Sequence, residues 1–398
     1  MTITRLSAAL ALAVLSHAMP SMAAEPIRIG FNSDLSASPS AQSSQHALLG
    51  FDAAIADINK QGGVLGRPLE LVVRDDVAQP PKAIQNMSDL IDGEKVVAVM
   101  GPTNSGNALA WKHIPNARKI PVITVLGTAT GITQPMAPGA DNYMFRLSAV
   151  DREQVVAILT YAAKNPATKK IAVFVETTGY GQGGLKDIEE LKGLYGLAPV
   201  IVDKFNVSDT DMTSQLNKMK AAGVDTIIMW GQGTPMGHVL RSMEKIDYFP
   251  IVLTSWASDN KSFIDAAGPK LGNIPIFLRT IAPDYTPRQQ QLYERVKDKI
   301  TAPSVFWATC QGYDAMKLLA LAMQQAGTTD GDAVRKALEN LKGIYEGYSK
   351  TYDKPFSAAN HEGIAGPDFV WTRWVDGKLT RYSDAVIAGL KPADFKRP

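Results

Sequence analysis

The chain has 398 residues, of which 45% are hydrophobic and 20% are charged; these values are typical of a globular protein long enough for two domains. The formal net charge is +2, and Lys and Arg are dispersed among Asp and Glu, so the sequence lacks the basic stripe of a nucleic-acid-binding protein. The single cysteine, Cys310, excludes an intramolecular disulfide and lies in an apolar stretch, so we expect a buried, inert thiol.

The N-terminus has the pattern of a secretory signal peptide. Arg5 precedes a short apolar run over residues 6–15, and the small residues Ser21 and Ala23 stand at the −3 and −1 positions of a cleavage site. The run is shorter than the about 20 residues that span a bilayer, and no cysteine follows that could be acylated. We therefore expect residues 1–23 to be removed and the mature protein to be periplasmic; the alternative is a hydrophobic first helix of the fold.

Strands and helices alternate along the chain that follows. The strands predicted in the first half are 26–31, 69–73, 96–100 and 120–125, and the helices are 46–59, 80–91 and 105–117. The helices predicted in the second half are 150–163, 185–194, 211–222, 236–246 and 260–267, and the strands are 170–175, 199–205, 225–230, 251–254 and 274–278. Such alternation with apolar strands predicts an α/β fold with parallel sheets covered by helices on both faces.

Two such halves predict two doubly wound lobes, with the break near residues 146–151. We assign residues 24–147 plus 279–350 to the first lobe and residues 148–278 plus 351–398 to the second. Three further helices, predicted over 288–300, 305–325 and 330–341, pack onto this frame. Asp376-Gly377, which lies between residues 369–375 and 378–382, predicts a β-hairpin.

One motif favours a different class of protein. Residues 179–184 read Gly-Tyr-Gly-Gln-Gly-Gly, a G-x-G-x-x-G between a strand and a helix, with Asp203 about 20 residues on, as in dinucleotide-binding enzymes. Against an NAD enzyme, the turn before the motif is long, the motif lies in the second lobe, and the chain is exported. We interpret it as a loop that needs backbone freedom beside a ligand-facing Tyr180.

Other catalytic chemistry lacks a signal in this sequence. No G-x-S-x-G elbow occurs, and the histidines after the leader are scattered without metal-ligand spacing. We therefore predict no enzymatic activity, no cofactor and no metal site.

Two strand-to-helix turns of the first lobe are better candidates for a site. Residues 100–106 and 124–130 are rich in Gly, Ser and Thr and follow neighbouring strands. Ligands of open α/β sheets bind at the carboxyl ends of strands, and unpaired N–H groups that open a helix attract anions. A single Ser or Thr at such a turn is more often only a helix cap, but two converging turns predict an anion site.

A series of short segments, taken in order, carries a resemblance to a known family. They are Ile27–Gly30, Gly50-Phe51, Gly62–Leu69, Gly101-Pro102, Ile120–Ile123, Phe145-Arg146, Tyr180-Gly181, Leu240-Arg241 and Tyr313–Ala315. Together they resemble the type I periplasmic binding proteins of the leucine/isoleucine/valine-binding kind, over nearly the whole mature chain. That family serves ABC importers of the branched-chain amino-acid class and holds its ligand in a cleft between two lobes.

The resemblance implies roles for particular residues. It implies that Ser105 holds the ligand carboxylate, that Leu126 offers a backbone N–H and Thr128 a hydroxyl, and that Tyr180 closes over the ligand. Asp151 matches the acid that begins the helix after the first crossover. We add two neighbours in the same turns to the expected site, Asn104 and Gly127.

Two departures from the family pattern bear on the ligand. Where the family places the acid that pairs with the ligand's α-amino group, this chain has Trp256, and the nearest acid is Asp259. The usual cleft-closing aromatic falls near Ser43. An unpaired ammonium in a dry cleft costs several kcal/mol, whereas Trp offers an apolar stacking face. Either the ligand is an aromatic or apolar acid, or Asp259 holds an amino group.

We therefore expect a solute-binding component of an ABC importer that captures a small carboxylate-bearing ligand by hinge closure and meets a membrane permease. We expect a monomer without nucleic-acid partners. The alternatives are a binder of branched-chain or other aliphatic amino acids, and an amide-binding, urea-binding or ligand-sensing protein of the same fold.

Overall fold

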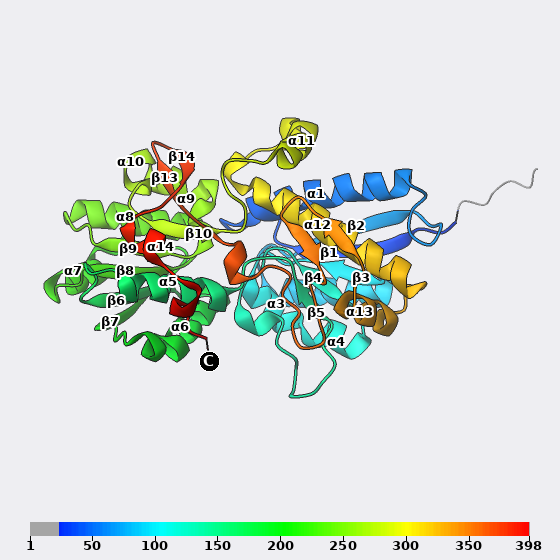
Figure 1. Ribbon diagram of the computed structural model, residues 1–398, viewed down its shortest axis with the longest axis horizontal. Coiled ribbons are helices and arrows are strands. Elements are labelled where there is room, and N and C mark those ends of the chain that lie inside the picture. Colours follow the sequence, from blue (N-terminus) through cyan, green and yellow to red (C-terminus); the bar gives the residue numbers. More distant parts are fainter. Residues whose placement is uncertain (1–23, 398) are drawn as a thin grey trace, which may run out of the picture.

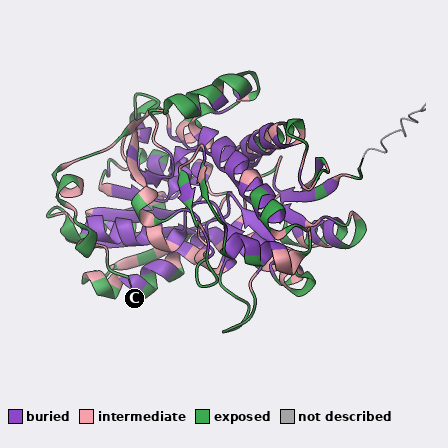
Figure 2. Ribbon diagram, turned by 45° about the vertical axis from the view of Figure 1, so that its right-hand side comes forward, coloured by how far each residue is buried: buried purple, intermediate pink, exposed green. Residues whose placement is uncertain are grey.

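The computed structural model describes residues 24–397, so the predicted signal peptide lies outside the described residues. Two α/β lobes lie side by side along the long axis of the molecule (Figure 1), and each is built around its own sheet. Buried residues concentrate on the strands and on the helix faces turned toward them (Figure 2). None of the helices in the described part of the chain combines the length and apolar character needed to cross a bilayer.

The first lobe contains a five-stranded sheet in which every strand pair is parallel, in the order β2-β1-β3-β4-β5. Its strands are β1 (Ile27–Ser33), β2 (Leu69–Asp75), β3 (Ala98–Met100), β4 (Val122–Thr124) and β5 (Met144–Arg146). The helices of this lobe are α1 (Ala41–Lys60), α2 (Pro80–Ser88), α3 (Ser105–Trp111), α4 (His113–Arg118), α12 (Phe306–Ala326) and α13 (Gly331–Glu339). The helix α11 (Pro287–Val296) precedes α12 in the chain.

The second lobe contains a seven-stranded sheet in the order β14-β13-β10-β9-β8-β6-β7. Its strands are β6 (Ile171–Glu176), β7 (Ile201–Phe205), β8 (Thr226–Trp230), β9 (Ile251–Thr254), β10 (Ile276–Arg279), β13 (Val370–Val375) and β14 (Lys378–Arg381). The helices are α5 (Asp151–Lys164), α6 (Gly179–Leu191), α7 (Thr213–Ala221), α8 (Gly233–Lys245), α9 (Lys261–Ala267), α10 (Pro269–Gly272) and α14 (Ala385–Gly389). Only β13 and β14 run antiparallel to their neighbours.

The predicted fold class is confirmed, and so is the hairpin at Asp376-Gly377. Both residues have positive φ, 49° and 75°, which is the backbone that a two-residue hairpin turn requires. Cys310 is fully buried, and burial raises the pKa of its thiol well above the ordinary value, so the thiol stays protonated.

Several predicted element bounds are wrong. The helix predicted over 185–194 begins at Gly179, because the Thr178 side chain caps it, and the helix predicted over 105–117 divides at Lys112. Three short strands lacked enough residues to show a period of two: β5, β11 (Ile344–Glu346) and β12 (Thr351–Asp353).

The chain passes between the lobes at three places. It leaves the first sheet at Arg146 and begins α5 at Asp151, it leaves the second sheet after Arg279, and it returns to the second sheet at β13. The predicted third change, at residue 350, falls inside the β11–β12 hairpin. Residues beyond that hairpin still contact the first sheet, since Phe356 packs on Phe145 at 5.1 Å between ring centroids and Glu362 bridges to Arg146.

The long helices α1 and α12 pack closely against one face of the first sheet, and two glycines make this possible. A Cβ on Gly50 of α1 would lie 2.1 Å from the backbone oxygen of Thr309. A Cβ on Gly312 of α12 would lie 2.5 Å from the backbone oxygen of Ala47. Neither distance is compatible with a real carbon, so each helix has a glycine at the point where the other helix crosses it.

We expect Gly50→Ala to lower the free energy of unfolding by about 1–3 kcal/mol, because the added methyl forces the two helix backbones apart. Gly93→Ala is the matched control, since its Cβ would meet no atom within 4 Å, and we expect it to change stability by less than about 0.5 kcal/mol. Urea denaturation of both variants measures the difference. Equal stabilities would contradict close packing of α1 on α12.

A candidate ligand site between the lobes

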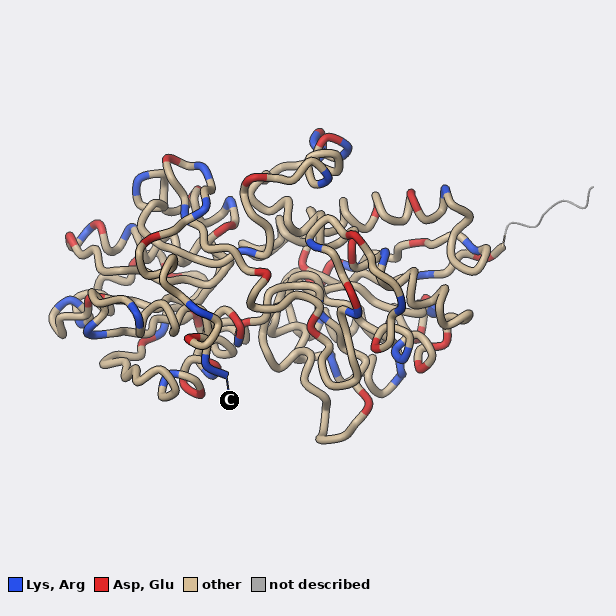
Figure 3. Tube along the Cα trace, in the orientation of Figure 1, with Lys and Arg blue, Asp and Glu red and all other residues tan. Residues whose placement is uncertain are grey.

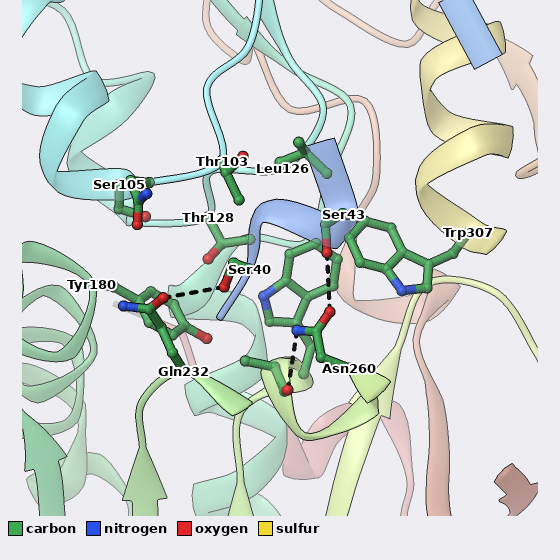
Figure 4. Close-up of a pocket in the computed structure, with 13 residues that line it drawn as sticks. Ser40, Ser43, Thr103, Ser105, Leu126, Thr128, Tyr180, Gln232, Asn260 and Trp307 are labelled. Atoms are coloured by element: carbon green, nitrogen blue, oxygen red, sulfur yellow. Dashed lines mark hydrogen bonds between the residues drawn. The ribbon is translucent and has the colours of Figure 1, made fainter. Parts of the chain in front are cut away.

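A cavity of about 40 Å³ lies between the two lobes, at the carboxyl ends of the strands. Its walls come from both lobes: Ser40, Ser43, Thr103, Asn104, Ser105, Leu126, Thr128, Tyr180, Gln232, Trp256, Ala257, Asn260 and Trp307. Figure 4 shows these side chains around the space. A wider groove of about 680 Å³ passes Arg279, Tyr285 and Trp374, and none of the residues predicted to bind ligand lines it.

The first predicted turn brings Asn104 and Ser105 to the cavity wall. Ser105 is the first residue of α3 and is buried. Its Oγ accepts a hydrogen bond from the Ala129 backbone N–H at 3.2 Å, which ties the first turn to the second. The Ser105 hydroxyl proton remains available to a ligand. The Asn104 Nδ2 is buried and has no hydrogen-bond partner among the described residues.

Arg146 fixes the second predicted turn. Its guanidinium is fully buried and donates to the backbone oxygens of Gly127 at 3.2 Å and Ala129 at 3.0 Å. It also forms an ion pair with Glu362 at 2.7 Å. The turn is therefore held from behind, and Leu126 and Thr128 form part of the cavity wall.

Gly127 does not line the cavity, contrary to our expectation. Its N–H donates to the Pro102 backbone oxygen at 2.9 Å and to Thr124 Oγ1 at 3.2 Å. Because the turn itself uses this N–H, Gly127 has a structural role that the sequence pattern could not distinguish from ligand binding.

Tyr180 and Trp256 reach the cavity from the second lobe. The Tyr180 hydroxyl has no hydrogen-bond partner in the described chain, and burial raises its pKa well above the ordinary value, so it remains a donor. Our interpretation of residues 179–184 as a loop is wrong, since these residues form the first turns of α6. The Trp256 ring lies across the cleft from Trp307 of α12, with 4.3 Å between centroids.

Asp151 lies behind the cavity wall and does not line the space. It begins α5, and its Oδ1 accepts a hydrogen bond from Gln154 Nε2 at 3.3 Å. The Gln154 Oε1 in turn accepts from the Trp256 backbone N–H at 3.0 Å. Burial raises the pKa of Asp151 well above the ordinary value, and its Oδ2 has no partner among the described residues.

Asp259 also lies outside the cavity wall. It is fully buried and forms an ion pair with the equally buried Arg279 at 3.2 Å between Oδ2 and Nε. Burial raises the pKa of Asp259, and the adjacent guanidinium acts in the opposite direction. The Asp259 carboxylate therefore already has a cationic partner within its own lobe.

The other wall residues had no binding role predicted from the sequence. They are Ser40, Ser43, Thr103, Gln232, Ala257, Asn260 and Trp307. Thr103 belongs to the first turn and could have been found there. Gln232 follows β8 at the edge that bears the site, and its backbone N–H donates to the buried Glu176 at 2.7 Å. The remainder come from helix starts that carry no motif.

The cavity wall carries no formal charge. None of the described residues around it is Asp, Glu, Lys, Arg or His, although charged residues of both signs are interspersed along the chain in both lobes (Figure 3). The wall combines hydroxyl, amide and backbone groups with three aromatic rings. It can hydrogen-bond an acceptor and bury an apolar body, but it offers no counter-charge.

Hydrogen bonds join the lobes around the cavity, so the cleft is closed in this structure. The Ser43 Oγ donates to Asn260 Oδ1 at 3.0 Å, and the Ser40 Oγ donates to Gln232 Oε1 at 3.3 Å (Figure 4). On another side, the Thr130 hydroxyl donates to Asp187 at 2.6 Å.

One acidic cluster elsewhere has the spacing of a cation site. The carboxylates of Asp34, Asp75 and Asp76 lie within 4.8 Å of one another. Asp34 accepts hydrogen bonds from three successive loop N–H groups, those of residues 36–38. Asp75 accepts from the N–H groups of Leu35 and Val77. These bonds give the cluster a role in shaping the loop.

Comparison with known proteins identifies the family. A periplasmic binding protein family model matches residues 26–377. The leucine-, isoleucine-, valine-, threonine- and alanine-binding protein of Pseudomonas aeruginosa is 28% identical over 338 residues, covering 84% of this chain and 87% of that protein. The chain therefore belongs to the periplasmic binding protein family, and it is a binding protein rather than an enzyme. The resemblance drawn from the sequence is confirmed.

Solved structures share the fold. A type 1 periplasmic binding protein from Bordetella pertussis superposes with a TM-score of 0.79 at 25% identity, covering 90% of this chain and 100% of that one. A solute-binding protein of an ABC transporter from R. palustris, in complex with 4-hydroxybenzoate, gives a TM-score of 0.74 at 18% identity, covering 90% and 96%. Both establish the type I arrangement of two lobes.

We expect Asp259→Asn to lower the free energy of unfolding by about 3–5 kcal/mol, because it leaves the Arg279 guanidinium buried without a counter-charge. Asp265→Asn is the control, since it breaks an exposed pair with Lys261 and should cost at most about 1 kcal/mol. Denaturant titration at pH 8 compares the two. An Asp259→Asn variant of unchanged stability would show that Asp259 is available for another partner.

Proposed function

We propose that this member of the periplasmic binding protein family is the extracytoplasmic solute-binding component of an ABC importer of the branched-chain amino-acid class. In this proposal it captures a small acid with an aromatic or apolar body between its lobes. The observation that carries the ligand assignment is the uncharged cavity wall, in which neutral donors stand beside three aromatic rings.

The first lobe supplies the groups for a carboxylate. The Ser105 hydroxyl, the Asn104 Nδ2 and the Thr128 hydroxyl line the cavity from two turns, which the hydrogen bond from the Ala129 N–H to Ser105 Oγ holds together. Hydrogen bonds from neutral donors to an anion contribute about 1.5–3 kcal/mol each, so a carboxylate can bind without a basic residue. The Leu126 backbone N–H is the fourth group that we assign to the anion.

The aromatic rings supply the wall for the ligand body. Trp256 and Tyr180 from the second lobe and Trp307 from the first surround the space with apolar surface. The cavity is smaller than the engineered cavity of about 150 Å³ that holds benzene. A ring-bearing acid therefore enters an open state, and wall side chains move aside to make room for it when the lobes reclose.

An α-amino acid fits the wall less well. Its ammonium would meet no carboxylate among the described wall residues, and leaving a buried charge unpaired costs several kcal/mol. Asp259, the alternative partner for an amino group, is paired with Arg279. These two observations favour acids that lack the amino group.

Aliphatic amino acids remain the second candidate, supported by one observation in the structure. The buried Asp151 lies behind the wall near Thr128 and Tyr180, and its Oδ2 has no partner among the described residues. A shift of the wall that exposed this oxygen would give an ammonium its counter-charge. The 28% identical relative named for leucine, isoleucine and valine binding agrees with this candidate.

Closure of the lobes gives the mechanism. A ligand stabilises the closed state through contacts that it makes with both lobes, since equal affinity for open and closed states would shift nothing. The chain crossings near residues 147–150, 280–286 and 364–369 are the proposed hinge. A monomer in the periplasm, with residues 1–23 removed, would present this closed form to a membrane permease.

Matched ligand pairs test the assignment by thermal shift on the refolded, ligand-stripped mature protein. 3-Phenylpropionate and phenylalanine differ only by the ammonium group, as do 4-methylpentanoate and leucine. We expect the amino-free member of a pair to raise the melting temperature more, by mass action on the native state. A larger shift with leucine would overturn the assignment, and a shift with amides or urea alone would exclude a carboxylate ligand.

Removal of one donor tests the anion site. We expect Ser105→Ala to lower the affinity for the acid that gives the largest thermal shift by about 10-fold or more, since a hydrogen bond to a charged group is lost. Ser208→Ala lies in an exposed turn of the second lobe and should leave affinity unchanged. Isothermal titration compares the three proteins. An unchanged Ser105→Ala affinity would remove the two turns from the carboxylate site.

A further inference from the structure

The glycines of residues 179–184 divide between two faces of α6. A Cβ on Gly181 would lie 2.0 Å from the Glu176 backbone oxygen, and one on Gly184 would lie 2.6 Å from the Trp230 ring. Those two glycines let α6 pack on its own lobe. The other two, Gly179 and Gly183, face the first lobe instead. Two glycines of the motif that resembled a dinucleotide loop therefore contact the other lobe, and the ligand site does not explain this contact.

Gly179 forms the closest of these contacts with the first lobe. A Cβ on Gly179 would lie 2.8 Å from the Gly106 Cα and 3.2 Å from the Gly106 backbone nitrogen, and no other atom outside its chain neighbours and its own helix backbone is within 4 Å. Carbon atoms pack best at about 3.5–4.0 Å, so an alanine would require the lobes to move apart there by about 0.7–1.2 Å. An alanine at position 106 would not force the lobes apart, because a Cβ on Gly106 would lie 3.8 Å from Gly179.

The contact extends along α6. A Cβ on Gly183, one turn further on, would lie 3.3 Å from the Ala129 Cβ. The neighbouring Thr130 hydroxyl donates to Asp187 of α6 at 2.6 Å. One face of α6 thus lies against α3 and the second turn of the first lobe, and backbone contact at Gly179 sets how near they come.

Cavity residues directly adjoin this contact. Ser105 precedes Gly106 in the chain, and Tyr180 follows Gly179. Both side chains line the cavity, one from each lobe. The separation of the two glycines therefore determines the separation of the group assigned to the ligand carboxylate and the group assigned to the lid.

We propose that Gly179 is a positioning residue for ligand capture: its missing side chain permits full closure and so brings Tyr180 to its place over the ligand. The proposal rests on the proposed function in that closure serves binding. It does not depend on which acid is bound, and it assigns Gly179 no contact with the ligand.

Disulfide trapping tests the proposal without a ligand. Cysteines at Ala129 and Gly183 would place their Cβ atoms close to the separation of about 3.5–4.5 Å that a disulfide requires, and only when the lobes are closed. The native Cys310 is buried, so the wild-type chain serves as the blank. The fraction cross-linked under mild oxidation reports closure, read by gel mobility without reductant.

In the Ala129→Cys/Gly183→Cys background, we expect Gly179→Ala to reduce the rate of cross-linking at least 5-fold, and the control Gly106→Ala to leave it within 2-fold. We expect Gly179→Ala not to lower the ligand-free melting temperature, because the added carbon meets no atom of its own lobe within 4 Å beyond its chain neighbours and its own helix backbone. Equal cross-linking rates in the two variants, or a lowered melting temperature with Gly179→Ala, would overturn the proposal.

A binding measurement completes the test, with 3-phenylpropionate and leucine as the probes. We expect Gly179→Ala to lower the affinity for whichever probe binds the wild type by about 5- to 100-fold, from the usual cost of overpacking. We expect Gly106→Ala to have little effect on that affinity. Unchanged affinity in Gly179→Ala would overturn the proposal. If neither probe binds the wild type, the ligand assignment fails, while the cross-linking result still decides the role of Gly179.

Discussion

The buried guanidinium of Arg146 holds the ligand site and the frame of the molecule together. It stands at the end of the last strand of the first sheet, at the point where the chain leaves for the second lobe. From there it donates to two backbone oxygens of the second turn and pairs with Glu362, in the segment that returns toward the second lobe. A cation without solvent requires such complete hydrogen bonding, and the turn and the crossing are fixed as a consequence.

The rigidity of that turn explains how an uncharged cavity can hold an anion. Donors that are already oriented need no reorganisation when the ligand arrives, so a few hydroxyl and amide groups suffice. The acids nearest the cavity are withdrawn from it: Asp259 is paired with Arg279, and Asp151 lies behind the wall beside Gln154. The site is therefore neutral at its surface although ionisable groups lie just beneath it.

Closure brings together walls that belong to different lobes, and the backbone contact at Gly179 limits how close they come. Hydrogen bonds such as Ser43 to Asn260 are formed across the cleft and can be exchanged for water when it opens. A steric contact between two backbones is different, because it sets a minimum separation that no side-chain rotation can change. The polar bonds favour the closed form, while the glycines define its geometry.

The sequence by itself determined the fold class, the alternation of strands and helices, the Asp376-Gly377 hairpin and the two turns that bear Ser105 and Thr128. Those features follow from periodicity and turn chemistry within a few residues of one another. Only the tertiary structure showed that Trp307 faces Trp256, that Ser40 and Ser43 reach Gln232 and Asn260, and that the Gly127 N–H is used within its turn. It also showed that Asp259, a candidate ligand group in the sequence, is paired with Arg279. These relations join segments up to about two hundred residues apart, and they depend on how closely the two lobes approach, which no local pattern encodes.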